Sequence, residues 1–488
     1  MFNFNIDSNK NKKLHFIGIG GVSMSALAEY LLSKGYRVSG SDSKKSDMTE
    51  HLKNLGAEIY YEHSGENLKD ADVVVYTDAI SMDNEELKTA IRRKLDLVDR
   101  AEFLGYVMQN FEFSIAVSGT HGKTSTTSMI TEVVYDDKSN PTIMLGGHLD
   151  KINGNIKIGE NNLFLTEACE YKGNIKKYFP SLAIILNIDE DHLDYFDNID
   201  HIISTFENYA ENLGESDYIL INSDDENSNT LKNHTKAKVL TFGIDKVSDY
   251  SAKNVTFLNG GFPKFDVFLK HKKLAEIELS VMGMHNVYNA LAAFAACHIY
   301  EIDAEKIAKS ISNYTGVHRR LEYKGSYDGI DVLDDYAHHP TEIKSTLSAI
   351  RNKYANDIYC IFQPHTFTRT KLLLNSFSKS FEDADKIIIP DIYAAREKDY
   401  GDIHSRVLVD AIIKNGKNAI YLGSFDEVKN YLLQNAKPGD CIVTMGAGDV
   451  FEIGEDILRE YENNQISLFE NNTQFETLNV HTEKIAVY

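Results

Sequence analysis

The residues Gly119-Thr-His-Gly-Lys-Thr-Ser125 have the types and the spacing of a phosphate-binding loop. An apolar run at 113–117 predicts a buried strand before them, and 126–134 predicts a helix after them. Backbone N–H groups at such a turn bind a polyphosphate, Lys123 would reach its β- and γ-phosphates, and the Thr124 hydroxyl would ligate Mg²⁺. The common pattern places glycine at Val117, so this loop is a shorter variant, and an ordinary glycine turn is the alternative. We predict ATP as the ligand of Gly119, Thr120, His121, Gly122, Lys123, Thr124 and Ser125.

A second glycine turn, Gly18-Ile-Gly-Gly21, lies between a predicted strand that starts at Lys13 and a predicted helix over 24–34. Asp42 ends the next predicted strand, about 20 positions on, where an acidic residue often holds a ribose. The pattern departs from G-x-G-x-x-G, because Ser23 takes the place of the third glycine. A non-redox nucleotide diphosphate is therefore favoured over NAD and over a purely structural turn.

Carboxylates and a histidine follow two further predicted strands of the segment that carries the phosphate loop. Glu167 and Glu170 follow the apolar run at 163–166, and His192 lies among acids after the run at 182–187. Carboxylate oxygens at strand ends beside a phosphate loop are suitable Mg²⁺ ligands. A solvated acidic loop is the alternative for either segment, and His192 could instead serve only as a hydrogen-bonding group.

Asn286 and Asn289 open an alanine-rich predicted helix over 287–300 and share one of its faces. From these residues alone we favour a simpler role for Asn286, the N-cap of that helix. Arg319 and Arg320 could bring guanidinium groups to a polyphosphate, and a solvated linker is equally compatible with them. The densest polar run, Asp334-Asp-Tyr-Ala-His-His-Pro-Thr-Glu342, follows a predicted strand, which favours function.

The length of 488 residues predicts about three domains, and alternating strands and helices predict parallel, doubly wound sheets. Residues 251–280 resemble an antiparallel insertion. The net charge of −22 argues against a nucleic acid or an anionic membrane as partner. Four scattered cysteines, a polar N-terminus and the lack of a long apolar run predict a cytoplasmic protein. We expect a monomer or a weak homodimer.

Taken in order, these motifs resemble those of the Mur ligase family over residues 13–460. The glycine turn and the Asp-Asp-Tyr-x-His-His box favour the alanine-adding branch of that family. The resemblance rests on Gly18-x-Gly-Gly-x-x-Met-Ser25, Gly119-Thr-His-Gly-Lys-Thr124, Glu167-Ala-Cys-Glu170, Asp191-His192, His285-Asn286-x-x-Asn289, Arg319-Arg320, Asp334-Asp-Tyr-x-His-His-Pro-Thr-Glu342 and Gln363-Pro-His365.

The resemblance implies an α/β protein of three domains. These are a Rossmann-like UDP-sugar domain (1–106), a central P-loop ATPase domain with a mostly parallel sheet (107–318) and a Rossmann-like amino-acid domain (319–462), before a polar tail (463–488). The implied reaction joins L-alanine to the carboxylate of UDP-N-acetylmuramate through an acyl phosphate, with ATP and Mg²⁺, in peptidoglycan precursor synthesis. A ligase that adds a peptide or another amino acid, a nucleotide-regulated binding protein and an NAD dehydrogenase are the rival interpretations.

The resemblance also implies roles for individual residues. Two departures bear on these roles, because many relatives have arginine at Thr366 and an acid at Cys169. The implied catalytic residues are Lys123, His192, Arg320, Asp335 and His339. The implied metal ligands are Thr124, Glu167 and His192, and Asn286, Asn289, Arg320 and Asp335 would contact the nucleotide. The implied substrate-binding residues are Gly18, Gly20, Gly21, Ser23, Met24, Ser25, Asp42, His365 and Arg369.

Overall fold

The computed structural model describes residues 10–258, 260–395 and 397–463. They form two compact units: the first contains the described residues up to Leu258 and from Phe262 to His318, and the second contains Gly260, Gly261 and the described residues from Arg319 on. From residue 464 on, the predicted polar tail lies outside the described residues. In the part of the chain that the structure describes, no helix is long and apolar enough to cross a bilayer.

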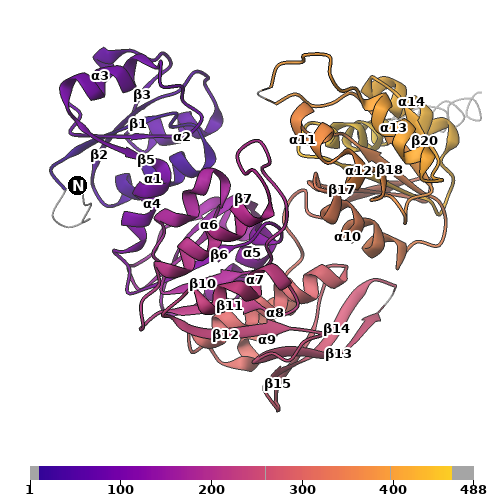
Figure 1. Cartoon of the computed structure of the whole chain (residues 1–488). Helices are drawn as coiled ribbons and strands as arrows, with labels where there is room; N and C mark the ends of the chain where they lie inside the picture. Colours follow the sequence, from indigo (N-terminus) through magenta and orange to yellow (C-terminus); the bar gives the residue numbers. More distant parts are fainter. Residues whose placement is uncertain (1–9, 259, 396, 464–488) are drawn as a thin grey trace, which may run out of the picture. The chain divides into compact units, whose positions relative to one another are not determined.

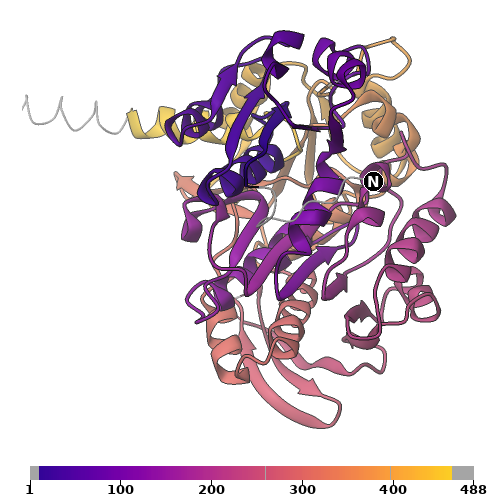
Figure 2. The same ribbon diagram turned by 90° about the vertical axis from the view of Figure 1, so that its left-hand side faces the viewer.

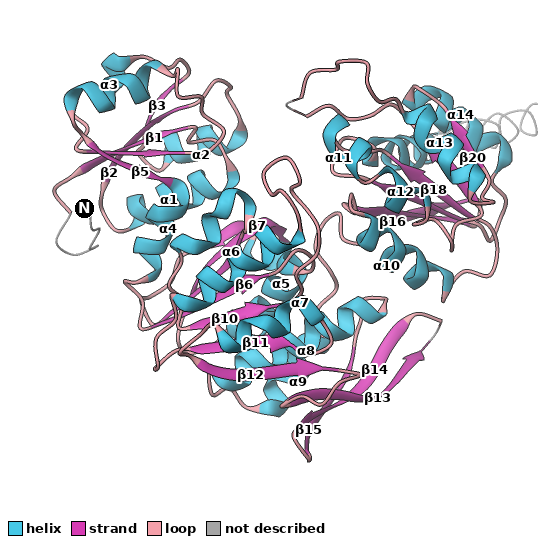
Figure 3. Cartoon of the chain, viewed as in Figure 1, coloured by secondary structure: helices cyan, strands magenta, loops and turns pink. Residues whose placement is uncertain are grey.

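The first sheet contains five parallel strands in the order β3-β2-β1-β4-β5, with helices on both faces (Figure 3). The strand order reverses between β1 and β4, which creates a switch point where such sheets bind ligands. The strands are β1 (Lys13–Ile17), β2 (Arg37–Ser41), β3 (Glu58–Tyr60), β4 (Val73–Tyr76) and β5 (Asp96–Asp99). The helices are α1 (Val22–Ser33), α2 (Asp47–Asn54), α3 (Glu85–Arg93) and α4 (Arg100–Met108).

The second sheet contains ten strands in the order β15-β14-β13-β12-β11-β10-β6-β9-β7-β8. Its strands from β13 to β7 are parallel, whereas β8, β14 and β15 are antiparallel to their neighbours. The strands are β6 (Phe113–Ser118), β7 (Thr142–Leu149), β8 (Gly154–Lys157), β9 (Leu163–Ala168), β10 (Leu182–Ile185), β11 (Tyr218–Asn222), β12 (Lys238–Gly243), β13 (Tyr250–Leu258), β14 (Phe262–Leu269) and β15 (Lys272–Glu278).

The antiparallel hairpin of β14 and β15 extends beyond the helices at one end of this sheet (Figures 1 and 2). It confirms the predicted insertion at 251–280, which joins the sheet through the parallel pairing of β12 with β13. The helices of this region are α5 (Lys123–Val134), α6 (Ile199–Glu211), α7 (Glu226–Asn229), α8 (Met284–Ile299) and α9 (Ala304–Ser312).

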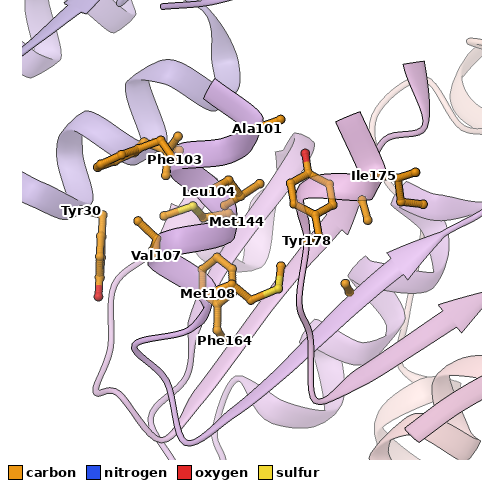
Figure 4. Close-up of a cluster of buried hydrophobic side chains, with 14 of the residues drawn as sticks. Tyr30, Ala101, Phe103, Leu104, Val107, Met108, Met144, Phe164, Ile175 and Tyr178 are labelled. Carbon is orange, nitrogen blue, oxygen red and sulfur yellow. The ribbon is translucent and has the colours of Figure 1, made fainter. Parts of the chain in front are cut away.

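Helix α4 packs its apolar side chains against the second sheet, and this contact joins the two sheets of the first unit. Phe103, Val107 and Met108 of α4 lie in one buried cluster with Phe164 of β9 and Tyr178 (Figure 4). Burying large apolar side chains stabilises such a contact by about 1.5–3 kcal/mol each. The first sheet is therefore held against the second by a shared core rather than by a polar linker.

The second unit contains a six-stranded sheet in the order β16-β17-β21-β18-β19-β20, in which only β16 is antiparallel. Helices lie on both of its faces, so the predicted α/β class holds for all three sheets (Figure 3). The strands are β16 (Glu322–Tyr327), β17 (Ile330–Asp335), β18 (Ile358–Phe362), β19 (Lys386–Ile389), β20 (Ala419–Tyr421) and β21 (Cys441–Met445). The helices are α10 (Pro340–Arg351), α11 (Phe367–Leu372), α12 (Leu374–Ser378), α13 (Ser405–Lys414) and α14 (Phe425–Asn435).

Candidate active site

The predicted phosphate loop is a tight turn between β6 and α5. Gly119 and Gly122 adopt φ angles of +133° and +85°, which favour glycine over every other residue. Helix α5 begins at Lys123, three residues earlier than its sequence predicted, so the helix N-terminus lies directly at the loop. Backbone N–H groups at such a terminus attract anions. The turn therefore has the backbone of an anion-binding site.

Asn187, at the end of neighbouring strand β10, clamps this loop. Its Oδ1 accepts a hydrogen bond of 2.8 Å from the His121 backbone N–H, and its Nδ2 donates to the His121 carbonyl. The Thr120 N–H also donates to the Asn187 carbonyl. Sequence reasoning missed this residue as a functional group. Its position as the last residue of the predicted strand at 182–187, which neighbours the loop, was the available signal.

Lys123 lies against a buried carboxylate. Its Nζ lies 3.1 Å from Glu170 Oε2, and it also donates to the carbonyls of Gly119 and Thr120. Burial would lower the pKa of Lys123, but the Glu170 carboxylate outweighs it, and the pKa lies above its ordinary value. Because the Glu170 side chain is only 2% exposed, the solvated-loop alternative is wrong for this residue.

His192 and Cys169 also lie near Glu170. His192 Nε2 lies 3.9 Å from Glu170 Oε1, and its ring lies 4.7 Å from that of Tyr171. Burial, reinforced by the Glu170 charge, raises the pKa of the Cys169 thiol, which is therefore neutral at pH 7. Glu170 thus accepts from Lys123 on one side and approaches the imidazole of His192 on the other.

Glu167, at the end of β9, forms an oxygen-rich group with Thr124. The Thr124 hydroxyl donates to Glu167 Oε2 over 3.1 Å, and the Gly146 backbone N–H donates to Oε1 over 2.8 Å. The hydroxyl and carboxylate oxygens are the donor types that Mg²⁺ prefers, and β9 pairs directly with β6. The donor set therefore suits a magnesium ion beside the loop.

Of the two predicted asparagines of α8, Asn289 reaches the phosphate loop and Asn286 is its hydrogen-bonding partner. Asn286 lies inside the helix, whose N-cap is Gly283, so the N-cap interpretation is wrong. Its Nδ2 donates to the Met282 carbonyl, and its Oδ1 accepts from Asn289 Nδ2 over 3.0 Å. A Cβ atom on Gly122 would lie 2.5 Å from Asn289 Oδ1. Asn289 is thus in direct contact with the phosphate loop.

The glycine turn of the first sheet lies at its switch point. Gly18 has a φ of +83°, and a Cβ there would lie 2.7 Å from Thr77 at the end of β4. Asp42 accepts hydrogen bonds from the backbone N–H groups of Gly20 and Lys44, so it stabilises the turn. Of the other predicted contacts, Gly21 and Ser23 are exposed and Gly20 is partly exposed, whereas Met24 and Ser25 are buried at the start of α1.

A short connection joins this turn region to the phosphate loop. Asp78 follows β4, and its Oδ2 accepts a hydrogen bond of 2.8 Å from Asn174 Nδ2. The Lys172 ammonium donates to the Asp78 carbonyl over 3.1 Å. Asn174 and Lys172 lie two to four residues beyond Glu170, which pairs with Lys123. One segment therefore touches both predicted ligand sites.

In the second unit, Asp335 ends β17 as a buried carboxylate. It accepts from the Thr346 hydroxyl and from the Ala337 N–H at 2.8 and 2.9 Å. Burial raises the pKa of Asp335 to about 6, although the charge of Arg320 and the Thr346 hydrogen bond oppose the rise. Arg320 itself lies over the Tyr336 ring, with 5.1 Å between its guanidinium carbon and the ring centroid.

The two neighbouring arginines differ in role. Arg319 donates to the Asp334 carboxylate over 3.1 Å and to the carbonyls of Gly446 and Gly448. These bonds tie it to the ends of β17 and β21, so the solvated-linker interpretation is wrong for Arg319. Its guanidinium has a structural task, whereas Arg320 is the arginine beside Asp335.

The remaining predicted residues of this unit follow the carboxyl ends of β17 and β18. His339 is the buried N-cap of α10 and accepts from the Thr341 N–H. The His365 ring lies 5.8 Å from both His338 and Tyr393, and its Nδ1 lies 3.3 Å from Arg369 Nη1. The structure therefore brings His365 and Arg369 together, with His338 as a neighbour that was not predicted individually.

Known proteins and family models match this chain in all three of its sheet-containing regions. Family models named "Mur ligase family, catalytic domain", "Mur ligase middle domain" and "Mur ligase, glutamate ligase domain" match residues 13–112, 117–297 and 319–448. Curated UDP-N-acetylmuramate–L-alanine ligases from Acetivibrio thermocellus and Clostridium perfringens are each 49% identical. The alignments cover 93% of this chain and 97% and 100% of those proteins.

Solved structures are similar over the same length. The UDP-N-acetylmuramate–alanine ligase of Thermotoga maritima is 29% identical, with a TM-score of 0.76, over 93% of this chain and all of that one. A murein peptide ligase from Psychrobacter arcticus is 25% identical, with a TM-score of 0.67, over 92% and 98% of the two chains.

Proposed function

The chain belongs to the Mur ligase family, and on that premise we propose that it joins L-alanine to UDP-N-acetylmuramate with the energy of ATP. The new amide bond joins the lactoyl carboxyl carbon of the sugar nucleotide to the alanine nitrogen, as peptidoglycan precursor synthesis requires. The curated relatives that carry this activity in their names support the assignment. The same family membership favours a nucleotide-sugar ligand at Gly18–Gly21 over NAD.

One observation carries the proposal, the connection between the two ligand sites of the first unit. The segment after β9 places Glu170 against Lys123 and Asn174 against Asp78, at the switch point of the first sheet. A sugar nucleotide held at that switch point would direct its carboxylate toward the phosphate loop. The arrangement supports phosphoryl transfer from ATP to a carboxylate, for which alignment of the two groups is the main requirement.

We assign the phosphoryl-transfer chemistry to the residues of the loop. Lys123 would leave Glu170 and neutralise the charge on the transferred phosphoryl group. Thr124, Glu167 and His192 would hold Mg²⁺, which supplies charge stabilisation for the phosphate oxygens. Asn289, at Gly122, would orient the nucleotide together with Asn286, to which it donates a hydrogen bond. On the family resemblance we also propose nucleotide contacts for Arg320 and Asp335.

The amide step uses the acyl phosphate as an activated carboxyl group. The alanine nitrogen attacks its carbonyl carbon, the carbon–oxygen bond to phosphate breaks, and inorganic phosphate leaves while nitrogen loses a proton. His339, His365 and Arg369 are our proposed alanine-positioning residues, since they lie at one sheet edge of the second unit. We further propose domains at 1–106, 107–318 and 319–462, a cytoplasmic setting and a monomer or weak homodimer.

Isotope transfer tests the acyl phosphate. UDP-N-acetylmuramate whose carboxylate carries heavy oxygen is incubated with ATP, Mg²⁺ and L-alanine, and the released phosphate is analysed by mass spectrometry. We expect one heavy oxygen in the phosphate for each amide formed. Release of the heavy oxygen as water, with unlabelled phosphate, would exclude the proposed intermediate.

A further inference from the structure

Two histidines and an aspartate from two distant segments of the first unit converge, and none of the three belongs to the proposed active site. His148 lies near the end of β7, Asp150 follows two residues later, and His318 is the last residue of the unit. His318 Nε2 lies 3.0 Å from Asp150 Oδ1, and His148 Nε2 lies 3.5 Å from the same oxygen. The two imidazole rings are 5.5 Å apart.

Buried side chains next to these residues in sequence hold the cluster in place. Leu149, the last residue of β7, is buried, whereas His148 before it and Asp150 after it are exposed. Val317, directly before His318, is also buried in the core of the central sheet. Two buried side chains therefore hold three exposed polar ones, and folding rather than chain proximity brings His318 to the pair.

The spacing fits a tetrahedral metal ion. One ligand atom from each residue lies within 4.8 Å of the others. A zinc ion about 2.1 Å from each of its ligands holds them about 3.4 Å apart, and the two nitrogen–oxygen separations of 3.0 and 3.5 Å bracket that value. Small side-chain rotations are sufficient to complete the coordination, because all three side chains are about half exposed or more.

The donor chemistry selects the kind of ion. Two imidazoles and one carboxylate suit Zn²⁺, Ni²⁺ or Cu²⁺, whereas Mg²⁺ prefers sites in which most ligands are oxygen atoms. Both imidazoles approach the same oxygen of Asp150, so one dication between the three groups would bind all of them at once. The cluster shares no residue with the proposed magnesium site at Thr124, Glu167 and His192.

We propose that His148, Asp150 and His318 form a binding site for a divalent transition metal ion of the zinc type, with its fourth position open to water. The bound ion would tie the end of β7 to the segment that closes the first unit. This site is independent of the proposed ligase activity, and its test does not depend on turnover.

Zinc titration of the untagged full-length protein tests the site. The titration is followed by competition with a chromophoric chelator, in excess Mg²⁺ and without nucleotide. We expect the wild-type protein to bind one more zinc ion than the His148→Ala/His318→Ala variant. Asp150→Asn should weaken that zinc by about 10- to 100-fold, because even outer-shell partners of metal ligands contribute this much. His51→Ala removes a histidine from an exposed pair with Glu29 and serves as the matched control.

Two further readouts keep the test decisive. Cobalt substitution should give the visible absorption of a tetrahedral site in the wild type and in His51→Ala but not in the double variant. Zinc should also raise the melting temperature of only those two proteins, since a ligand bound to the folded state stabilises it. Circular dichroism without metal establishes that the double variant is folded. Equal zinc stoichiometry and equal cobalt spectra for wild type and folded double variant would overturn the proposal.

Discussion

The Lys123 ammonium lies 3.1 Å from the Glu170 carboxylate, and both groups are largely removed from solvent. The pair joins the first residue of α5 to the segment after β9. The lysine that we expect to contact ATP is thus held by a protein carboxylate and two loop carbonyls in the free protein. We infer that ATP phosphates exchange with Glu170 as the partner of this lysine.

A double-mutant cycle separates the structural and catalytic contributions of this pair. Lys123→Met leaves Glu170 as an unpaired buried carboxylate, which should reduce the free energy of unfolding by on the order of 3 kcal/mol. Adding Glu170→Gln should restore most of that stability, but phosphate release should stay at least about 100-fold below wild type. Stability is measured by urea denaturation, and binding of UDP-N-acetylmuramate should be retained. Lys306→Ala, which removes an exposed pair with Asp137, is the control. Near-normal turnover by the double variant would show that Lys123 has no catalytic role.

Gly122→Ala should abolish nucleotide binding for a steric reason. The new Cβ atom would lie 2.5 Å from Asn289 Oδ1, at a φ of +85°. Gly35→Ala is a matched control, because Gly35 has a φ of +84° with no neighbouring atom within 4 Å. Both variants should lose about 1–2 kcal/mol from the left-handed backbone, but only Gly122→Ala should lose ATP affinity in calorimetry. Similar ATP affinities for the two variants would contradict the placement of Asn289 at the nucleotide.

Glu167→Gln should weaken magnesium binding at the phosphate loop. The substitution keeps the size of the side chain but removes the negative charge of the carboxylate, whose oxygens accept hydrogen bonds from the Thr124 hydroxyl and the Gly146 N–H. We expect the Mg²⁺ concentration for half-maximal phosphate release to rise about tenfold or more, with UDP-N-acetylmuramate affinity unchanged. Glu160→Gln, an exposed carboxylate before β9, should leave the magnesium dependence as it is. An unchanged magnesium curve for Glu167→Gln would remove this residue from the proposed metal ligands.

The stability of the second unit should depend on pH through Asp335. Its pKa is about 6 in the folded protein and 3.8 in a model peptide, because burial disfavours the charged form. The resulting stabilisation is fully present below pH 3.8 and is lost as the pH rises to about 6, by about 3 kcal/mol in total. Asp335→Asn cannot ionise and should lack this pH dependence. The difference in unfolding free energy between variant and wild type is measured from pH 3.5 to 7.5. A constant difference over that range would contradict the raised pKa.

The sequence predicted the local part of this architecture well. The phosphate loop, the glycine turn and most strands follow from short motifs and apolar runs, because each depends on neighbours within a few residues. The N-cap interpretation of Asn286 failed because α8 begins earlier, at Met284, beyond the reach of the alanine-rich pattern. Helix ends depend on tertiary packing as well as on local preference.

The contacts between distant segments could not be predicted. Asn187 reaches His121 only because β10 pairs with β6, and Glu170 reaches Lys123 only because β9 pairs with β6 on its other side. Arg319 and Arg320 are adjacent in the sequence and of the same type. Only Arg319, however, is seen to donate to the carbonyls of Gly446 and Gly448 after β21. Strand order in the folded sheet decides these contacts, and single-sequence patterns do not encode it.

Amino-acid-dependent phosphate release tests the central claim most directly. The wild-type enzyme is given ATP, Mg²⁺ and UDP-N-acetylmuramate with L-alanine, glycine, L-serine or the tripeptide that murein peptide ligases add, and one arm omits the sugar nucleotide. We predict rapid release with L-alanine, slower release with glycine and serine, and only background release with the tripeptide or without the sugar nucleotide. Release with the tripeptide that equals or exceeds release with L-alanine, or release that needs no sugar nucleotide, would contradict the account.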